Sequence, residues 1–443
     1  MRPRTWLRIV GASATLLLIA FGPASRTGAD IPDGNPLLDA ASLPDVSPPP
    51  FAADPFLKSW YQTPHDEAGV TDPLSDAWIS SVVKAVGGPN DFVTLGGVGD
   101  DSTGGKTFWR VPSPPPGQRT EIDCFSTPGG SNPCNFPTDV KDPVGCAAGA
   151  LECFKVNVQD GWVPGDSSDS VMVVFDQNRY TDENGTDGNY AIWLYHACPP
   201  LPFTNSFCGS GRQHGTKWTA EGLSVSYLDS NGLPGCWPVN YPDALSAPWL
   251  GLNGDGYNFG HFGVPPPYQS IRYDEVVMSV GSGPPQGSPN WTDQTDAGVA
   301  PIPHMLKLVL PSAVTSDQHF FPSTGDDGDG SNPIPMGIQM RIRPGVTITR
   351  EMVGGNKYAL AIAMTLQTYG TVVGDSTNDL VLSGTENLVL EGSSHRWSDL
   401  GLTSDALSGI PLEDFEFLYR GYGGPSKLDY VLFGSACEDA PIR

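Results

Sequence analysis

Basic residues are scarce in this chain of 443 residues, where 24 lysines and arginines accompany 49 aspartates and glutamates and the formal net charge is -25. Binding to nucleic acid needs a basic surface that displaces counterions from phosphates, so this balance excludes nucleic acid as a partner. It also disfavours anionic polymers, unless a local basic groove holds one. We attribute the acidity to the solubility of an extracellular protein.

Long hydrophobic runs are also missing. The apolar run at residues 9–21 is shorter than the about 20 residues that a membrane-spanning helix needs, so we expect no membrane insertion. The run follows Arg2, Arg4 and Arg8 and precedes a small-residue stretch that ends at Ala29, a pattern typical of a secretory signal peptide. We therefore predict a signal peptide over residues 1–29 and a secreted, extracellular mature chain that begins near Asp30.

Several catalytic and metal-binding motifs are absent from the sequence. No G-x-S-x-G, H-E-x-x-H or C-x-x-C motif occurs, which excludes ordinary lipases and zincins and argues against a zinc knuckle. We expect no cofactor. One alternative stays open, because residues 326–332 place oxygen-bearing side chains at alternating positions as a calcium loop does, while a solvated acidic turn is the simpler interpretation.

Cysteines are few and even in number. In an exported chain an even count indicates disulfides, and three pairs are separated by short loops rich in glycine, proline, serine or asparagine. We expect local pairing within those three and a fourth bond between the remaining two: Cys124 with Cys134, Cys146 with Cys153, Cys198 with Cys208, and Cys236 with Cys437.

Glycine and proline are abundant, with 53 and 44 residues, and this abundance disfavours long helices and favours turns. Short apolar or alternating segments typical of strands recur instead. Two are continuously apolar, as expected of strands buried on both faces, at residues 171–175 and 190–195. Three alternate with period two, at residues 223–228, 302–310 and 338–343.

Helical spacing of apolar residues occurs at residues 357–369, which Gly370 follows as a typical helix-ending residue. Residues 371–373 and 380–382 flank a polar turn and predict a hairpin. The predicted fold is mainly β, with sandwich or jelly-roll-like sheets, one helix packed on a sheet and many long loops. Residues 30–55 predict a disordered lead and residues 56–443 one disulfide-stapled domain; a division into two packed subdomains near 240–265 stays open.

Polar residues on a predicted strand at residues 271–276 are the first candidates for chemistry. Alternation puts Arg272 and Asp274 on one face and Tyr273 and Glu275 on the other. Tyr273, Glu275 and His304 can then supply a general acid or base with an orienting group. The alternative is structural: Arg272 pairs with a buried charge, and His304 is a core histidine whose ring nitrogens are both bonded.

Arg341 is the second candidate for contact with a substrate. It lies on the polar face of the strand at residues 338–343, where a guanidinium can hold the carboxylate of a uronate, although a surface ion pair is the simpler role. Aromatic rings can stack on sugars or fill a β core equally well. The tryptophans for which both roles stay open are Trp60, Trp193, Trp218, Trp237, Trp249 and Trp291.

The second half of the chain resembles a family of secreted bacterial proteins. The residues that carry the likeness are the segments Ile271-Arg272-Tyr273-Asp274-Glu275-Val276, Pro303-His304-Met305-Leu306-Lys307-Leu308 and Pro335-Met336-Gly337. That family carries R-Y-D-E-V and H-A-L-R-F strands and a P-P-M-G loop, and here Met305 and Lys307 replace the usual alanine and arginine. The resemblance implies a fold and a candidate site region, and it carries over no activity.

Two function classes follow from these observations. The first is a secreted carbohydrate-active enzyme, a polysaccharide hydrolase or lyase, with Glu275, His304 and Tyr273 in catalysis and Arg272 and Arg341 on the substrate. The second is a non-catalytic extracellular or cell-wall-associated protein with a binding or structural role. A groove lined by these side chains favours the first class, and a filled interior favours the second.

We predict that the mature protein has no free thiol, because all eight cysteines follow the predicted signal peptide and their number is even. Titration with a thiol reagent after denaturation without reductant should give almost no signal. The same titration after reduction serves as the control. Reactive thiols in the unreduced sample contradict complete pairing.

Overall fold

The structure is a computed structural model, and all described residues belong to the compact unit Pro44–Arg443. The fold is mainly β, as the sequence predicts, with sheets of mixed orientation. The described residues are 71–87, 92–97, 107–110, 120–124, 153–156, 158, 161–165, 170–181, 187–204, 207–208, 216–227, 270–281, 298–319, 328–383, 389–390, 393–394 and 397–418. The predicted signal peptide, the predicted lead and the proposed boundary near 240–265 lie outside these residues.

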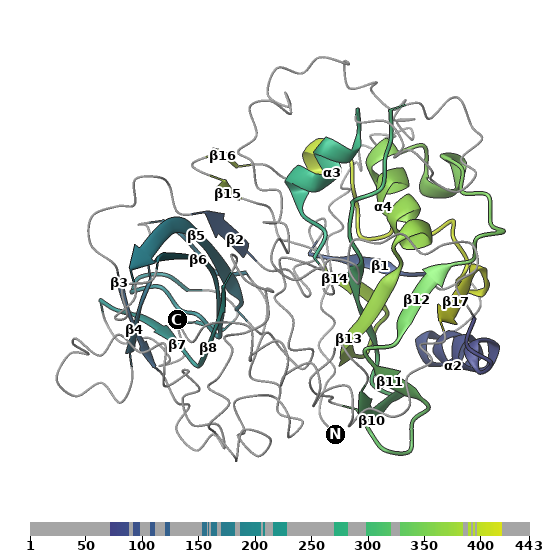
Figure 1. Cartoon of the computed structure of the whole chain (residues 1–443), viewed down its shortest axis with the longest axis horizontal. Helices are drawn as coiled ribbons and strands as arrows, with labels where there is room; N and C mark the ends of the chain where they lie inside the picture. Colours follow the sequence, from purple (N-terminus) through teal and green to yellow (C-terminus); the bar gives the residue numbers. More distant parts are fainter. Residues whose placement is uncertain are drawn as a thin grey trace, which may run out of the picture. The chain divides into compact units, whose positions relative to one another are not determined.

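A six-stranded mixed sheet forms the larger of the two β assemblies (Figure 1). Its strand β9 pairs in parallel with β13 and antiparallel with β14, so β9 lies inside the sheet rather than at an edge. In spatial order the strands are β1 (Thr94–Gly96), β14 (Val381–Ser383), β9 (Leu306–Pro311), β13 (Thr371–Thr377), β12 (Gln339–Ile342) and β17 (Phe415–Leu418).

The register of this sheet separates an apolar face from a polar one. Met340 lies opposite Phe417, and Arg341 lies opposite Glu416. Because successive side chains of a strand point to opposite faces, Met340 and Phe417 share one face, while Arg341 and Glu416 share the other. The predicted alternation at residues 338–343 is therefore confirmed, and both faces are buried there.

The strand predicted over residues 302–310 begins later, at Leu306. Pro301 and Pro303 have no backbone N–H to donate to a strand partner, and the amide of Ile302 donates to Thr365 Oγ1 at 2.7 Å instead. His304 thus lies in the segment before β9 and not on the strand.

The predicted hairpin between residues 371–373 and 380–382 is wrong in its pairing. Both segments are strands, β13 and β14, but each pairs with β9, which lies between them. Residues 378–380 connect the two strands, and an extended run of that length spans about 10 Å. This matches the two interstrand spacings, about 4.8 Å each, that separate strands on either side of β9.

Helix α4 (Lys357–Thr368) confirms the helix predicted at this place. Asn356 caps its start, since its side-chain oxygen accepts from the amides of Tyr358 and Ala359. Gly370 follows its end with φ 70°, a conformation that glycine adopts without strain. Every α4 residue from Tyr358 to Thr368 is buried, so the helix is enclosed on all sides.

Helix α3 (Tyr273–Ser279) corrects the predicted strand at residues 271–276. Tyr273, Val276 and Val277 are all buried, and their i, i+3, i+4 spacing is that of one helix face. Arg272 occupies the N-cap position in an extended conformation. A short apolar run that contains charges fits both the strand period of two and the helix period of 3.6, so alternation alone led to the wrong assignment as a strand.

Helix α2 (Ser75–Val86) is a further helix that the expectation of a single helix did not include. It packs against β17 and β9, with Trp78 in an edge-on contact with Phe417 at 5.4 Å between ring centroids. Ser75 Oγ accepts from the amide of Phe417 at 2.9 Å, which fixes the start of the helix against the sheet.

Two sheets that pack face to face form a sandwich in the first half of the chain, which agrees with the predicted architecture. One sheet has the order β2 (Thr107–Arg110), β5 (Met172–Thr181), β6 (Asp187–Tyr195) and β8 (Gly222–Tyr227). The other has the order β4 (Cys153–Val156), β3 (Thr120–Cys124) and β7 (Trp218–Ala220). The strands β5, β6 and β8 confirm the strands predicted at residues 171–175, 190–195 and 223–228.

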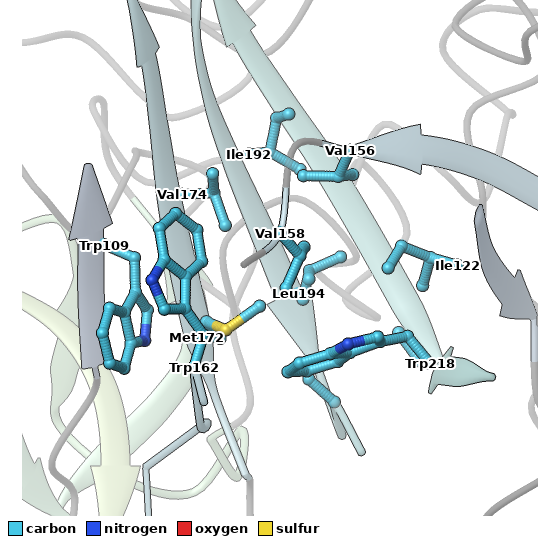
Figure 2. Close-up of a cluster of buried hydrophobic side chains, with 12 residues drawn as sticks. Trp109, Ile122, Val156, Val158, Trp162, Met172, Val174, Ile192, Leu194 and Trp218 are labelled. Atoms are coloured by element: carbon cyan, nitrogen blue, oxygen red, sulfur yellow. The ribbon is translucent and has the colours of Figure 1, made fainter. Parts of the chain in front are cut away.

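The core of the sandwich draws side chains from both sheets (Figure 2). Met172 and Leu194 of the four-stranded sheet and Ile122 and Trp218 of the three-stranded sheet belong to the same buried cluster. Trp109 adds a stacked contact with Trp162 at 5.0 Å, and its indole N–H donates to the carbonyl of Val163. Burial of apolar surface between the two sheets is what holds them together.

Smaller elements complete the described structure. They are the strand pairs β10 (Thr315–His319) with β11 (Ile334–Met336) and β15 (Val389–Leu390) with β16 (Ser393–Ser394), and the 3₁₀ turns η6 (Glu351–Val353), η7 (Trp397–Leu400) and η8 (Leu412–Asp414). Within the described ranges, no helix has the length and apolar character needed to cross a membrane.

We expect Leu366→Asp to lower the free energy of unfolding by about 3 kcal/mol or more, because it places a charge without a partner inside a core. Leu366 lies on α4 and is completely buried. Ser80→Asp on the exposed part of α2 is the matched control and should change stability little. Urea unfolding followed by circular dichroism checks both, and equal midpoints for the two variants would contradict the burial of this helix.

Candidate functional site

Arg272, Glu275 and His304 form one cluster, which we call the buried triad. Arg272 precedes α3 and donates through Nη2 to Glu275 Oε1. His304 lies before β9 and places Nε2 3.1 Å from Glu275 Oε2. The structure therefore brings together three of the five site residues predicted from the sequence.

Both ring nitrogens of His304 face acceptors. Nδ1 lies 2.8 Å from the carbonyl oxygen of Met305, and Nε2 faces the Glu275 carboxylate. A carbonyl and an ionised carboxylate accept hydrogen bonds and donate none, so both ring nitrogens are directed at protein acceptors. A ring in this arrangement offers no free lone pair with which to take a proton from a substrate.

The charge state of Glu275 follows from its surroundings. Burial by itself would raise the pKa of the Glu275 carboxyl, but the Arg272 guanidinium and the His304 ring outweigh burial and lower that pKa. The carboxylate is thus ionised, with the Arg272 guanidinium and the His304 ring as its partners. This pairing meets the requirement that a charge inside a protein has a partner of opposite sign and hydrogen bonds.

Solvent access to the triad is almost absent. The exposed fractions are 2 % for Arg272, 2 % for Glu275 and 1 % for His304. A substrate that contacts these atoms must first open the packing around α3 and the segment before β9. In this conformation the triad is part of the interior.

Tyr273 also lies in the interior, beside Trp397. Their ring centroids are 5.6 Å apart with the planes inclined at 53°. Burial, and after it the charge of Asp399, raises the pKa of the Tyr273 hydroxyl. A hydroxyl with a raised pKa keeps its proton at neutral pH and is a poor general base.

Arg341 is paired with Glu416 on the polar face of the six-stranded sheet. Arg341 Nε donates to Glu416 Oε1 at 2.8 Å, and the hydroxyl of Thr71 donates to Glu416 Oε2 at 2.7 Å. Arg341 is 1 % exposed. The ion pair expected at the surface is therefore buried, and Arg341 has no open side toward a uronate in this conformation.

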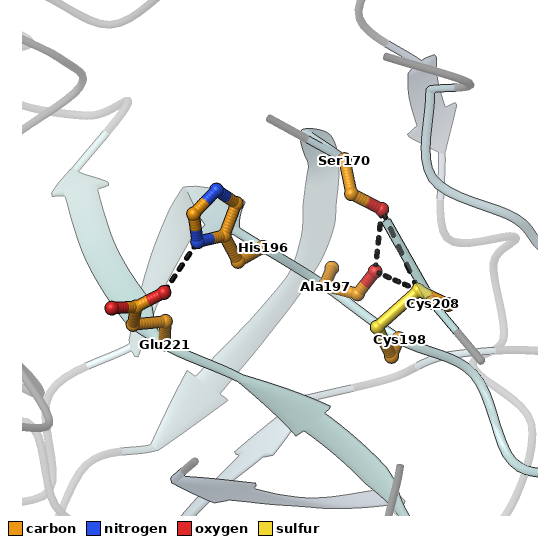
Figure 3. The surroundings of a disulfide bond; sticks show 6 residues. All are labelled: Ser170, His196, Ala197, Cys198, Cys208 and Glu221. Atoms are coloured by element: carbon orange, nitrogen blue, oxygen red, sulfur yellow. Dashed lines mark hydrogen bonds and ion pairs between the residues drawn. A yellow bond between two sulfur atoms is a disulfide. The ribbon is translucent and has the colours of Figure 1, made fainter. Parts of the chain in front are cut away.

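A second carboxylate–imidazole pair lies in the sandwich and was not predicted from the sequence. Nδ1 of His196 contacts Oε2 of Glu221, and their side chains are 18 % and 10 % exposed (Figure 3). We call His196 and Glu221 the open pair. The two residues are 25 positions apart and belong to no known spacing motif, so the sequence offers no signal that joins them.

The ring of His196 lies between two other rings. Its centroid is 3.8 Å from that of Tyr195 and 3.9 Å from that of Phe207, and the planes are nearly parallel. The backbone of His196 has φ 53°, in the left-handed region that residues with a side chain seldom adopt. Strain of this kind persists where surrounding contacts impose it and is enriched at functional sites.

The disulfide between Cys198 and Cys208 follows directly after this histidine (Figure 3). It confirms one of the four predicted pairs, with the Cα atoms 5.7 Å apart. Ser170 contacts the residue between His196 and Cys198, since its hydroxyl donates to the carbonyl of Ala197 at 2.8 Å. The side chains of the other six cysteines lie outside the described residues.

The other residues singled out in the sequence are those of the possible calcium loop and the tryptophans, and those that the structure describes make contacts within the protein. Asp329 Oδ1 accepts from the amide and the hydroxyl of Ser331, both at 3.0 Å, and the backbone bond is the main reason why the pKa of Asp329 is lowered. Asp326 and Asp327 lie outside the described residues. Trp193 and Trp218 are buried, and Trp193 stacks on Tyr195. Among the described residues, no group of three or more histidine, cysteine, aspartate or glutamate side chains is arranged to hold a metal ion.

In comparisons with known proteins, no family model, no curated protein and no solved structure matches this chain.

We expect the buried triad to make stability depend on pH in the acid range. Because the pKa of Glu275 is lowered from 4.5 in the folded state, its stabilising contribution is present above that value and is lost as the pH falls through the folded-state pKa. Glu275→Gln removes this component and, at neutral pH, should cost about 3–5 kcal/mol because Arg272 and His304 lose their partner.

Urea unfolding at a series of pH values measures this effect. Glu413→Gln, at an exposed position of η8, is the control and should leave the pH dependence as in the wild type. If the wild type and Glu275→Gln give parallel curves of stability against pH, the triad does not titrate as described.

Proposed function

We propose that this chain is an exported extracellular protein with a binding or structural role and that the buried triad stabilises its fold instead of catalysing a reaction. One observation carries this proposal: both ring nitrogens of His304 are committed to protein acceptors in an environment that is 1 % exposed. A general acid or base must reach the proton that it transfers, and this ring reaches only its own protein.

Export is supported by two independent features. Arg2, Arg4 and Arg8 followed by the apolar run at residues 9–21 have the composition of a secretory signal. The Cys198–Cys208 disulfide fits an oxidising compartment, since such bonds are rare where thiols are kept reduced. Together they favour a protein that works outside the cell.

Neutral polysaccharide is the ligand class that we propose for such a binding role. The net charge of -25 disfavours nucleic acid and other polyanions. Of the six tryptophans considered for sugar stacking, Trp193 and Trp218 are buried, so a sugar-stacking role for these two has no support. The other four, Trp60, Trp237, Trp249 and Trp291, lie outside the described residues. Ligand contact then depends on groups other than the rings of Trp193 and Trp218.

A polysaccharide hydrolase or lyase is the second candidate function. The open pair favours it, because His196 combines a carboxylate on one ring nitrogen with partial exposure, as catalytic imidazoles do. In this case catalysis belongs to His196 and Glu221 and not to His304, Glu275 and Tyr273.

A panel of neutral and acidic polysaccharides distinguishes the two functions. Binding is measured by co-sedimentation with the insoluble glycan, and turnover is measured by new reducing ends and by the absorbance of unsaturated uronides. The primary proposal predicts retention on a neutral glycan without turnover. Turnover that disappears in His304→Ala at unchanged folding would contradict the structural role of the triad.

We expect His304→Ala to lower the free energy of unfolding by about 1–3 kcal/mol, because the Glu275 carboxylate and the Met305 carbonyl lose a donor. Binding per folded molecule should not change. His196→Ala is the matched control, since it removes a histidine that is paired with a carboxylate in the same way but is partly exposed. A melting temperature of His304→Ala equal to that of the wild type would show that the triad contributes little to stability.

A further inference from the structure

We infer that His196 is a reactive site for neutral acyl electrophiles, with Nε2 as the nucleophilic atom and Glu221 as the group that prepares it. The inference goes beyond the proposed function and does not rest on it, since a binding protein can carry a reactive side chain. Within the described residues, this histidine differs from His304 in both bonding and exposure.

Glu221 fixes the tautomer of the His196 ring. An ionised carboxylate can only accept, so Nδ1 carries the hydrogen in their contact. The neutral ring then keeps its lone pair on Nε2. A carboxylate on Nδ1 also orients the opposite nitrogen, as it does for histidines in catalytic and metal sites.

Aromatic contacts hold the ring in one orientation. Tyr195 and Phe207 cover its two faces at 3.8 and 3.9 Å, which leaves the ring edge as the accessible part of the 18 % exposed side chain. The ring therefore loses little rotational freedom on reaction.

Charge near the open pair selects the class of electrophile. Asp123 lies opposite Thr219 on the neighbouring strand, Thr219 bridges to Cys198, and Glu221 follows two positions later. Lys217 Nζ pairs with Asp123 at 3.2 Å and offsets that one carboxylate. The net charge of -25 of the chain disfavours anionic phosphoryl groups and leaves neutral esters and anhydrides as the favoured class.

The reaction with diethyl pyrocarbonate, the probe that we choose, balances without any further reactant. The Nε2 lone pair attacks a carbonyl carbon, and the bond from that carbon to the bridging oxygen breaks. The ring becomes a carbethoxy-imidazole and the Nδ1 proton leaves through Glu221 to solvent. The departing ethyl carbonate takes up a proton and decomposes to ethanol and carbon dioxide.

Carbethoxylation of the full folded protein tests the inference. At about pH 8, above the value of about 6.5 at which an ordinary imidazole titrates, peptide mass spectrometry follows the modification of each histidine with time. We expect His196 to react faster than N-acetylhistidine methylamide in the same buffer, and His304, with both nitrogens bonded, to react much more slowly than either. Glu221→Gln should lower the rate of carbethoxylation at His196 several-fold, because a neutral amide can accept a hydrogen bond from Nδ1 but cannot take up its proton.

Two results would overturn the inference. One is a wild-type rate at His196 equal to or below that of the free compound, which shows a ring that is not activated. The other is an unchanged rate in Glu221→Gln whose circular dichroism spectrum matches that of the wild type. If Glu221→Gln fails to fold, the comparison of the wild type with the free compound still decides the question.

Discussion

The ionised carboxylate of Glu275 is the point on which the arrangement around β9 depends. It lies between Arg272, which precedes its own helix, and His304, which precedes the central strand of the six-stranded sheet. A charge in this position is tolerated only with its partners in place, because the cost of desolvation exceeds what one partner returns. The place of α3 against the start of β9 is therefore fixed by charge as well as by the packing of Tyr273 and Val276.

The polar face of the six-stranded sheet extends the same constraint across three more strands. Lys307 of β9 donates to Asp375 of β13 at 2.6 Å, and Arg341 of β12 pairs with Glu416 of β17. A slip of one residue between β12 and β17 would set Arg341 opposite Phe415 or Phe417 and leave both charges without partners. These pairs thus specify strand register, which an apolar face alone specifies less sharply.

How much of this could be predicted from the sequence depends on the range of the interactions involved. Helix α4 was predictable because its apolar spacing and the Gly370 stop are local signals, and the alternation at residues 338–343 gave the right faces. Helix α3 was not, because seven residues are too few to separate period two from period 3.6. The pairing of β13 and β14 with β9 could not be predicted for a different reason. It joins strands that are far apart in the sequence, whereas a hairpin joins neighbouring strands and is indicated by the turn between them.

The candidate site residues were also predicted only in part: the buried triad was expected from the sequence, and the open pair was not. The polar residues at 272–275 and His304 were predicted to form one cluster, and His304 and Glu275 do meet in the buried triad. The open pair could not be found in this manner, because His196 and Glu221 are 25 positions apart, with a disulfide loop and strand β7 between them. The residues next to His196 and Glu221 in the sequence do not indicate that the two side chains meet.

The contrast between the two histidines shows why the same pair of residue types has different chemistry in the two places. His304 and His196 each face a glutamate, but His304 also donates to a backbone carbonyl, and the interior around it excludes water and substrate. His196 uses one nitrogen for its carboxylate and its ring faces for Tyr195 and Phe207, and its side chain is 18 % exposed. Reactivity requires an accessible lone pair, so the number of ring nitrogens already bonded, and not the presence of a carboxylate, separates a structural histidine from a reactive one in this chain.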